Sequence, residues 1–189
     1  MNEGTPALQP NEPSLVIRAA APDDLPACSR LDAGYHTDYV WQMQFQEDER
    51  AVQSAFQRVR LPRTMAVAYP YPPEAVQAML EAAAHVLVAC YGDALIGCAA
   101  GEVQDWSHTF LLHTLIVHPR ARRRGVGRLL LDALKETAVQ DGCRRLNVMV
   151  QSKNYPAIQF ARKEGFAFCG YNDRYYPNGD IALFFSLGL

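Results

Sequence analysis

The middle of the chain passes from an unbroken apolar run into a segment with apolar residues at every third or fourth position. Residues 109 to 117 are rich in leucine and β-branched side chains and predict a buried strand that ends before Pro119. From residue 126 the spacing is that of a helix with one apolar face, which Gly142 is expected to end. The predicted core-facing positions of this helix are Val126, Leu129, Leu130, Ala133, Leu134, Thr137 and Ala138.

Shorter segments with alternating or uniformly apolar residues predict further strands on both sides of this unit. The expected strands span residues 15–18, 56–62, 85–90, 94–104 and 145–150. Pro177, Asn178 and Gly179 predict a turn, followed by a last apolar strand. Strands interspersed with helices indicate an α/β chain.

Helices are predicted at the start of the chain and before the strand at 85–90. The first begins near Ala21 with acidic residues in its first turn, and helical spacing continues loosely through Leu31, Tyr35, Tyr39 and Val40 towards Phe45. Residues 69–73 hold alternating tyrosine and proline and predict an extended turn. A helix over 74–84 follows.

Composition limits which kinds of protein this chain can be. The 189 residues, 49% of them hydrophobic, suit one domain over residues 15–189 with a sizeable core. Residues 1–14 are polar and proline-rich, which predicts a disordered leader without a signal peptide. No stretch is apolar for the roughly 18 residues that a membrane span needs, so a cytoplasmic protein is expected. The five cysteines form no C-x-x-C pair, which predicts reduced core thiols and no metal site.

Charge is concentrated in the turn between the strand at 109–117 and the following helix. Five arginines between residues 120 and 128 contribute +5, whereas the whole chain carries −2, so the remainder carries −7. A helix N-terminus offers unpaired N–H groups and a partial positive charge, and Gly125 and Gly127 leave room for an anion to approach them. The turn therefore predicts a phosphate site, although a basic helix start that binds nothing remains an alternative.

The turn lacks the Gly-Lys-Ser/Thr of a Walker loop and the spacing of a dinucleotide fold. Arg122-x-x-Gly125-x-Gly127 resembles the acetyl-CoA pyrophosphate loop of the GCN5-related N-acetyltransferase (GNAT) superfamily. A second stretch, Asn154-x-x-Ala157-x-x-Phe160 followed by Gly165-Phe166, is similar to the downstream motif of that family. The resemblance covers about residues 85 to 185.

The resemblance implies the GNAT acyl-CoA N-acyltransferase fold: a mixed, mostly antiparallel sheet with helices on both faces, split between the strands ending at Val117 and Val150. It also implies that acetyl-CoA is the cosubstrate and that an amine attacks it directly, without a covalent enzyme intermediate. The cofactor-binding residues implied are Leu115, Ile116, Val117, Arg122, Arg123, Arg124, Gly125, Val126, Gly127, Arg128, Asn154, Ala157 and Phe160.

Two residues are candidate bases for deprotonating the amine. By alternation, His113 shares the face of Val117, and it occupies a position at which serotonin N-acetyltransferases have a catalytic histidine; the second histidine of that group is Leu111 here. Glu102, near the end of the preceding strand, is the second candidate, acting through water. The alternatives are a hydrogen-bonded strand histidine and a solvated carboxylate.

In most members of the family a tyrosine after the phenylalanine of the second motif protonates the leaving thiolate. This chain has Ala161 at that position, so the usual proton donor is missing. The segment from residue 170 to 185 resembles the closing hairpin of streptothricin acetyltransferases, and its Tyr175 and Tyr176 are candidate donors, with sheet packing as the alternative. This likeness and the acidic remainder of the chain favour a small cationic amine as acceptor.

The aromatic residues between positions 35 and 45 either contact the acceptor or form core; they are Tyr35, His36, Tyr39, Trp41 and Phe45. The segment from residue 47 to 84 is long for this family and covers either the substrate side or a dimer surface, or is a plain insertion. Dimerisation is common among members of the family, so a homodimer is a further expectation from the resemblance.

Other functions stay open at this point. The acceptor could be a protein N-terminus or lysine in place of a small molecule. The missing tyrosine at position 161 also suits a CoA-binding module without turnover. Nucleic-acid binding through the arginines is disfavoured, because the basic stretch is short and no aromatic residues interleave with it.

Overall fold

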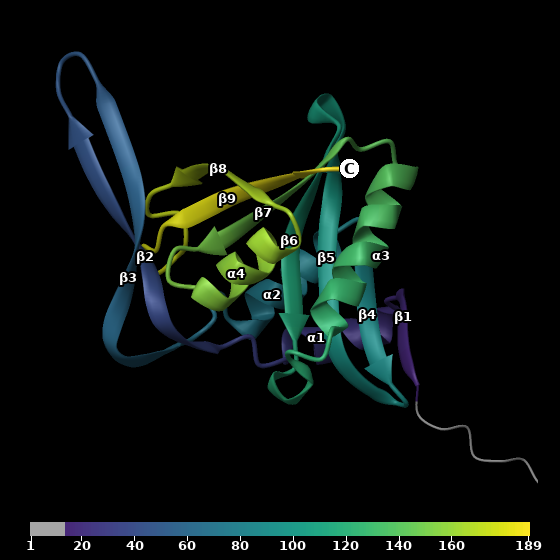
Figure 1. Cartoon of the computed structure of the whole chain (residues 1–189). Coiled ribbons are helices and arrows are strands. Elements are labelled where there is room, and N and C mark those ends of the chain that lie inside the picture. The colour runs from purple at the N-terminus through teal and green to yellow at the C-terminus, as the bar shows by residue number, and fades with distance from the viewer. Residues whose placement is uncertain (1–13) are drawn as a thin grey trace, which may run out of the picture.

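A seven-stranded sheet forms the body of the molecule, and a separate two-stranded hairpin lies beside it (Figure 1). The computed structural model describes residues 14–189, so nearly all of the leader predicted at residues 1–14 lies outside the described part. In chain order the elements are β1 (Leu15–Ala19), α1 (Leu25–Ser29), β2 (Tyr35–Glu47), β3 (Val52–Val67), α2 (Pro73–Ala82), β4 (His85–Tyr91), β5 (Ala94–Gln104), β6 (Thr109–Val117), α3 (Val126–Gln140), β7 (Arg145–Gln151), α4 (Tyr155–Lys163), β8 (Ala167–Asn172) and β9 (Ala182–Gly188).

The large sheet has the strand order β1-β4-β5-β6-β7-β9-β8. Every neighbouring pair is antiparallel except β6 and β7, which run parallel. This arrangement confirms the mixed, mostly antiparallel sheet that the sequence predicts.

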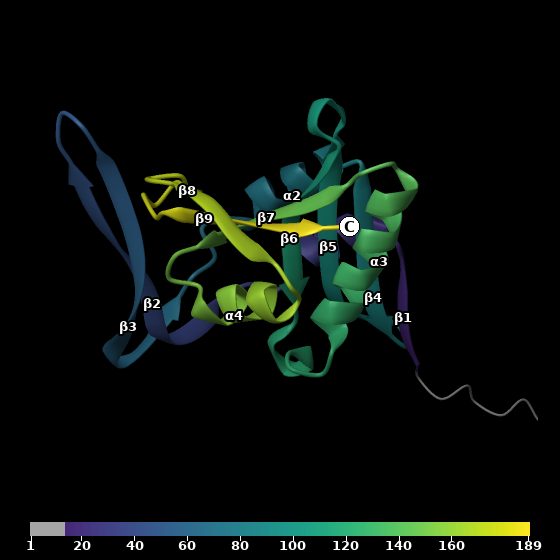
Figure 2. The ribbon, with the colours of Figure 1, turned by 45° about the horizontal axis from the view of Figure 1, so that its top comes forward.

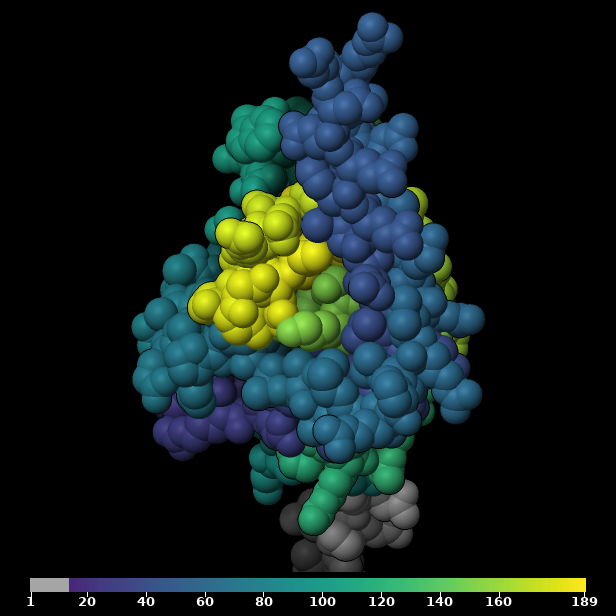
Figure 3. Space-filling model, turned by 90° about the vertical axis from the view of Figure 1, so that its left-hand side faces the viewer, coloured from purple at the N-terminus to yellow at the C-terminus, as the bar shows by residue number. Residues whose placement is uncertain are grey.

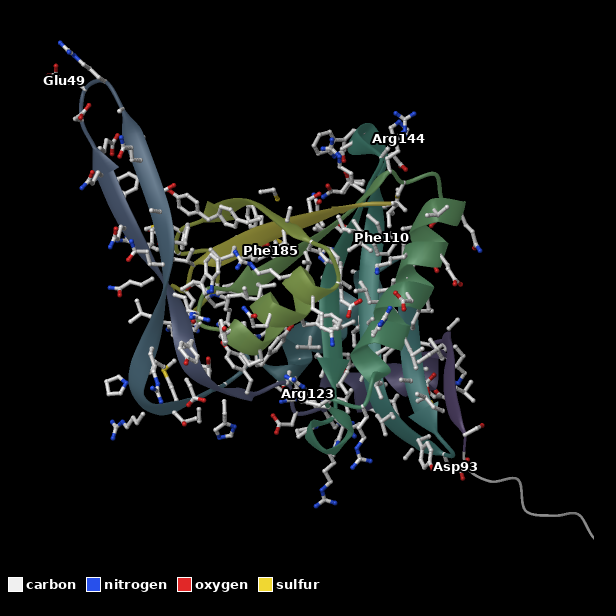
Figure 4. The ribbon with its side chains drawn as sticks, viewed as in Figure 1. Glu49, Asp93, Phe110, Arg123, Arg144 and Phe185 are labelled. Atoms are coloured by element: carbon white, nitrogen blue, oxygen red, sulfur yellow. The ribbon has the colours of Figure 1, made fainter. Side chains whose placement is uncertain are left out.

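Helices cover both faces of the sheet, which gives a core on each side (Figures 1 and 2). On one face α3 and α4 pack against the strands, with Leu130, Leu134 and Ile158 fully buried. On the other face α1 and α2 enclose a smaller cluster that includes Cys28 and Leu80. Phe110 of β6 and Phe185 of β9 are fully buried in the larger cluster (Figure 4).

The apolar face of α3 differs slightly from the predicted one. Val126, Leu130, Leu134 and Ala138 are buried as expected, because residues four apart lie along one side of a helix. The prediction was wrong for Leu129, which is 46% exposed. Leu131, which the predicted face left out, is fully buried.

The helical continuation predicted from Leu31 towards Phe45 was wrong, because Tyr35–Glu47 is strand β2. Its sequence explains the error: Trp41, Met43 and Phe45 alternate with glutamines, and this period of two places the apolar side chains on one face of a strand. β2 pairs with β3 along almost its whole length, and the hairpin extends away from the body to a tip near Glu49 (Figure 4).

The base of this hairpin is fixed to the rest of the molecule. The backbone N–H of Trp41 donates to the carbonyl of Ser152 at 2.8 Å, and the guanidinium of Arg162 lies over the Trp41 ring at 4.3 Å. Phe56 of β3 packs edge-on against Tyr171 of β8. The hairpin therefore forms a wall beside β7, α4 and β8.

The remaining predicted elements are found close to their expected positions. The strand at Thr109–Val117 has the predicted bounds, and the strand predicted at 56–62 is the centre of the longer β3. Of the cysteines, Cys28, Cys98 and Cys143 are buried free thiols, but Cys169 is exposed, so the prediction of core thiols was wrong for that residue. No helix within residues 14–189 is long and apolar enough to cross a membrane.

Candidate active site

The sheet opens between its only parallel neighbours, β6 and β7. Their pairing covers Thr109–Leu112 and Arg145–Val148, after which the two strands diverge. The backbone groups that β6 turns towards β7 beyond Leu112 therefore have no strand to pair with. A cleft between these strand ends is the split that the resemblance implies.

β6 contains a bulge at the point where the cleft begins. Ala100 of β5 pairs with Thr114 and Gly101 pairs with Leu112, so His113 has no partner on β5. The bulge also inverts the alternation: Phe110 and Leu112 face the α3 side before it, and Leu115 and Val117 do so after it.

The bulge corrects the prediction that His113 and Val117 share a face. His113 instead contacts Glu102, which belongs to the α2 side of β5, because Val103 next to it packs on the α3 side. The His113 Nε2 atom lies 3.3 Å from Glu102 Oε1. The two candidate bases thus form one pair, with Glu102 the more exposed partner.

A cavity of about 140 Å³ occupies the cleft next to this pair. His113 and Thr114 of β6 border it on one side and Gln151 of β7 on the other. Tyr175 and Tyr176, predicted as candidate proton donors, also line it. The cavity therefore brings the predicted base and the predicted donors together.

Sequence reasoning missed two further tyrosines of this cavity. Tyr69 and Tyr71, from the segment before α2, line it together with Pro70. Their rings lie 5.9 Å apart edge to face, and Tyr71 is also 5.9 Å from the ring of Tyr176. The alternation of tyrosine and proline is the signal that could have revealed them, because it fixes the backbone of an aromatic segment.

Burial makes these hydroxyl groups weaker acids. Burial raises the pKa of Tyr69 to about 12, and burial together with the neighbouring tyrosines raises the pKa of Tyr176 well above its ordinary value. The pKa of Tyr71 is raised for the same two reasons. All three remain neutral near pH 7 and can donate a hydrogen bond or a proton.

The wall of the cavity on the β7 side belongs to a buried polar network. The Tyr35 hydroxyl donates to Gln151 Oε1 at 3.1 Å, and Gln151 Nε2 donates to Asp180 Oδ2 at 2.9 Å. Lys153 forms an ion pair with the other oxygen of Asp180. Opposite this network, the Thr114 hydroxyl is buried and has no hydrogen-bond partner within residues 14–189.

The aromatic residues between positions 35 and 45 were predicted either to contact the acceptor or to form core, and only some of them lie near the cavity. Tyr35 is buried and reaches the cavity through Gln151, whereas Trp41 and Tyr39 pack against α4 and its N-terminus. His36 is exposed and Phe45 lies on the exposed part of the hairpin. Figure 3 shows the hairpin (blue) and the C-terminal segment (yellow), with the green surface of the segment around residues 150–160 set back between them.

A row of free backbone donors lies at the start of α3, at the other end of β6. Within the described chain, the backbone N–H groups of residues 123 to 127 donate no hydrogen bond. Gly125 caps the helix with φ +89°, a conformation that favours glycine, and a Cβ built on it would meet no atom within 4 Å. Open N–H donors at the positive end of a helix are groups that favour an anion.

The arginines of the turn differ in their availability. Arg123 and Arg124 are exposed, and Arg123 lies at the lower end of the molecule (Figure 4). Arg128 is near two carboxylates, those of Asp132 at 3.6 Å and Glu164 at 3.7 Å. Arg122 donates to three backbone carbonyls, so its side chain is not the free phosphate ligand that the motif implies.

The second motif lies next to the same turn. Asn154 caps α4, its side chain accepting from the N–H of Ala157 at 3.1 Å, and Ala157 lines the cavity. Phe160 is the neighbour of Gly127: a Cβ on that glycine would meet the Phe160 ring at 3.8 Å. Ala161 is buried in the core.

Comparisons with known proteins agree with this geometry. Residues 41–166 match the model of the acetyltransferase (GNAT) family. The chain is 28% identical over 183 residues to a streptothricin acetyltransferase of Streptomyces lavendulae, with 90% of this chain and 93% of that protein covered.

Two solved structures extend the comparison. The fold is similar to that of a nourseothricin acetyltransferase, with a TM-score of 0.80, 26% identity, and coverage of 92% of this chain and 98% of that one. It is also similar to a Bacillus anthracis str. Ames protein in complex with acetyl coenzyme A, with a TM-score of 0.72, 18% identity, and coverage of 93% and 100%. A cleft beside free N–H donors suits a thioester with a pyrophosphate, and the chain belongs to the acetyltransferase (GNAT) family, as an acetyl-CoA-dependent N-acetyltransferase.

Proposed function

We propose that this enzyme acetylates a primary amine of a small cationic molecule. The observation that carries the proposal is the His113–Glu102 pair at the edge of a cavity of about 140 Å³, a volume suited to an amine and an acetyl group. The streptothricin acetyltransferase of Streptomyces lavendulae, similar over 90% of this chain, supports a small-molecule acceptor. The negative charge outside the arginine-rich turn supports a cationic one.

His113 is the base in this proposal. Its Nε2 atom faces Glu102 at 3.3 Å. The other ring nitrogen, Nδ1, takes a proton from the acceptor ammonium, directly or through a water molecule, and Glu102 stabilises the imidazolium that forms. The neutral amine then attacks the thioester carbonyl, a C–N bond forms and the C–S bond breaks. The attacking nitrogen loses its second proton in this step, and that proton replaces the one that a cavity tyrosine gives to the leaving thiolate. The chemistry that acetyl-CoA supplies is the activated acetyl group, so no covalent enzyme intermediate is needed.

The main chain of the turn and of β6 holds the cosubstrate. The N–H groups of residues 123–127 bind the pyrophosphate, with the charges of Arg123, Arg124 and Arg128 adding to the attraction. Residues 115–117, on the part of β6 that diverges from β7, bind the pantetheine as an added strand. Asn154, Ala157 and Phe160 border it from α4.

The leaving thiolate takes its proton from a tyrosine of the cavity, because Ala161 has none to give. Tyr176, predicted from the sequence, is one candidate, because it lines the cavity and is neutral near pH 7. Tyr69 is the second, for the same reason. Tyr175 is 38% exposed and forms the outer side of the cavity.

Thiol release with a panel of acceptors tests the proposal. The panel contains nourseothricin, spermidine and a short peptide with a free N-terminus, each mixed with acetyl-CoA and purified enzyme. We expect saturable turnover with at least one of the two small cations and none with the peptide. Turnover with the peptide alone would overturn the proposed substrate class and favour a protein N-terminus as acceptor.

A further inference from the structure

The side chain of Arg122 joins two parts of the chain that lie far apart in sequence. Its Nε donates to the carbonyl of Val117 at 2.8 Å, at the end of β6. Its two terminal nitrogens donate to the carbonyls of Gly34 at 2.7 Å and Asp32 at 2.5 Å, in the segment between α1 and β2. One guanidinium thus ties the start of the phosphate-binding turn to residues 32–34.

Residues 32–34 form part of a second cavity, of about 510 Å³, on the α2 side of the sheet. This second cavity is also bordered by Ile116, Tyr69 and Tyr71. The two tyrosines line the active-site cavity as well, so they form a common wall. Residues 32–34 thus border the same cavity as two tyrosines of the active-site cavity.

The local structure holds the two carbonyls in place for Arg122. Asp32 Oδ1 accepts a hydrogen bond from the N–H of Gly34 at 2.9 Å, which closes a tight turn. A Cβ on Gly34 would lie 3.0 Å from that oxygen and 3.4 Å from the carbonyl of Val67, so the turn leaves no room for a larger residue. Tyr35 follows directly and is buried.

The charge of Arg122 is not balanced by a direct partner. Its three bonds go to neutral carbonyls, and within the described residues no carboxylate forms a salt bridge with it. Its own backbone adjoins the free N–H groups of residues 123–127. An anion bound to those groups would bring a negative charge to the turn that carries Arg122, and a negative charge near an uncompensated guanidinium stabilises it.

We infer that Arg122 is a positioning residue. Through its side chain, binding of an anion to the phosphate-binding turn orders residues 31–37, and these residues in turn order the side of the active-site cavity that takes the acceptor. This inference rests on the proposed function in placing the pyrophosphate of the cosubstrate on the turn. In this role Arg122 acts through its side chain on residues 32 and 34, and the main chain of residues 123–127 holds the phosphates. The coupling operates before any acceptor binds.

Hydrogen exchange with CoA as the probe tests the coupling. In the unmodified protein, saturating CoA is expected to slow amide exchange of residues 31–37 by about fivefold or more, the low end of ordinary coupling energies. Arg122→Lys keeps the positive charge but loses the guanidinium N–H groups that reach three carbonyls at once. In this variant, saturating CoA is expected to leave the exchange of residues 31–37 unchanged. Arg124→Ala is the control: it weakens CoA binding but keeps the slowing once CoA is saturating.

A second pair of variants tests the same link without touching Arg122. Asp32→Ala removes the acceptor that closes the turn and is expected to abolish the effect of CoA on residues 31–37. Asp32→Asn keeps an oxygen at that position and is expected to retain it. Thermal unfolding of each variant shows whether it is folded.

The outcomes separate this inference from the proposed function. Slowing by CoA that persists in Arg122→Lys, or its absence in the unmodified protein although CoA raises the melting temperature, would overturn the coupling and leave the enzyme assignment intact. If Arg122→Lys only raises the Kd for CoA, Arg122 is a phosphate ligand. If CoA does not stabilise the unmodified protein at all, the placement of the cosubstrate on the turn fails.

Discussion

His113 of β6 and Glu102 of β5 meet on the α2 side of the sheet, with 3.3 Å between Nε2 and Oε1. Leu112 faces the α3 side, so alternation along β6 places His113 on the same side as Glu102, and the bulge then returns Leu115 and Val117 to the α3 side. His113 thus both contacts Glu102 and lines the cavity.

Replacing the base tests this arrangement. His113→Gln cannot accept a proton and is expected to lower kcat by about 100-fold and to remove the rise of kcat with pH, while the KM for acetyl-CoA stays within about twofold. Glu102→Gln keeps a polar group without the charge, so we expect a smaller loss of about tenfold. Steady-state kinetics across pH 6 to 9 measure both.

His118→Gln is the matched control, since His118 lies beyond the strand and accepts from the N–H of Arg120. Its kcat should equal that of the unmodified enzyme. A wild-type kcat and pH profile in His113→Gln would remove His113 from the mechanism.

A methyl group at the phosphate-binding turn should weaken cosubstrate binding. Gly125 and Gly142 lie near opposite ends of α3, both with positive φ and with no atom within 4 Å of where a Cβ would lie, so alanine should cost each about 1 kcal/mol of stability. Gly125→Ala alone should also weaken CoA binding by about tenfold or more, because the strained turn misplaces its N–H groups. Calorimetric titration with CoA and thermal unfolding measure the two effects. Equal CoA affinity in the two variants would contradict the placement of the pyrophosphate.

Removing a cavity hydroxyl should slow release of the thiol. Tyr176→Phe and Tyr69→Phe are each expected to lower kcat by about tenfold, with the larger loss at the true donor. Tyr91→Phe is the control, because Tyr91 is 51% exposed at the end of β4. If both cavity variants keep the full kcat, CoA leaves as the free thiolate and no tyrosine replaces the missing one at position 161.

Stability should fall at alkaline pH. The folded-state pKa of Tyr69 is about 12, above the ordinary value of 10, and those of Tyr35 and Tyr176 are also raised, mainly by burial. The unfolded chain loses these protons first, so the stabilisation is full below about pH 10 and is lost as pH rises towards 12. Thermal unfolding between pH 8 and 12 measures the decline.

The contribution of one tyrosine can be isolated in the same experiment. Tyr69→Phe should make the decline between pH 10 and 12 shallower than in the unmodified protein, whereas Tyr91→Phe should not change it. An identical slope in Tyr69→Phe would mean that this hydroxyl titrates no differently in the folded and unfolded states.

Local patterns in the sequence determined most of the elements and predict the phosphate site in the turn before α3. The run from Thr109 to Val117, the glycines 125 and 127 and the helix after them are contiguous, so their chemistry is readable from spacing alone. The prediction that a helix continues through residues 35–45 was wrong. In this segment a loose helical spacing coincides with a stricter strand pattern, in which apolar and polar residues alternate.

Only the tertiary structure decided which side chains share the cavity. The bulge at His113 depends on how β5 and β6 pair, and the contacts of Arg122 with residues 32 and 34 span about 90 residues, so neither leaves a local pattern. Tyr71 packs against Tyr176 for the same reason: packing joins two segments more than a hundred positions apart. The sequence determined the chemistry that is available, and long-range packing determined which groups act together.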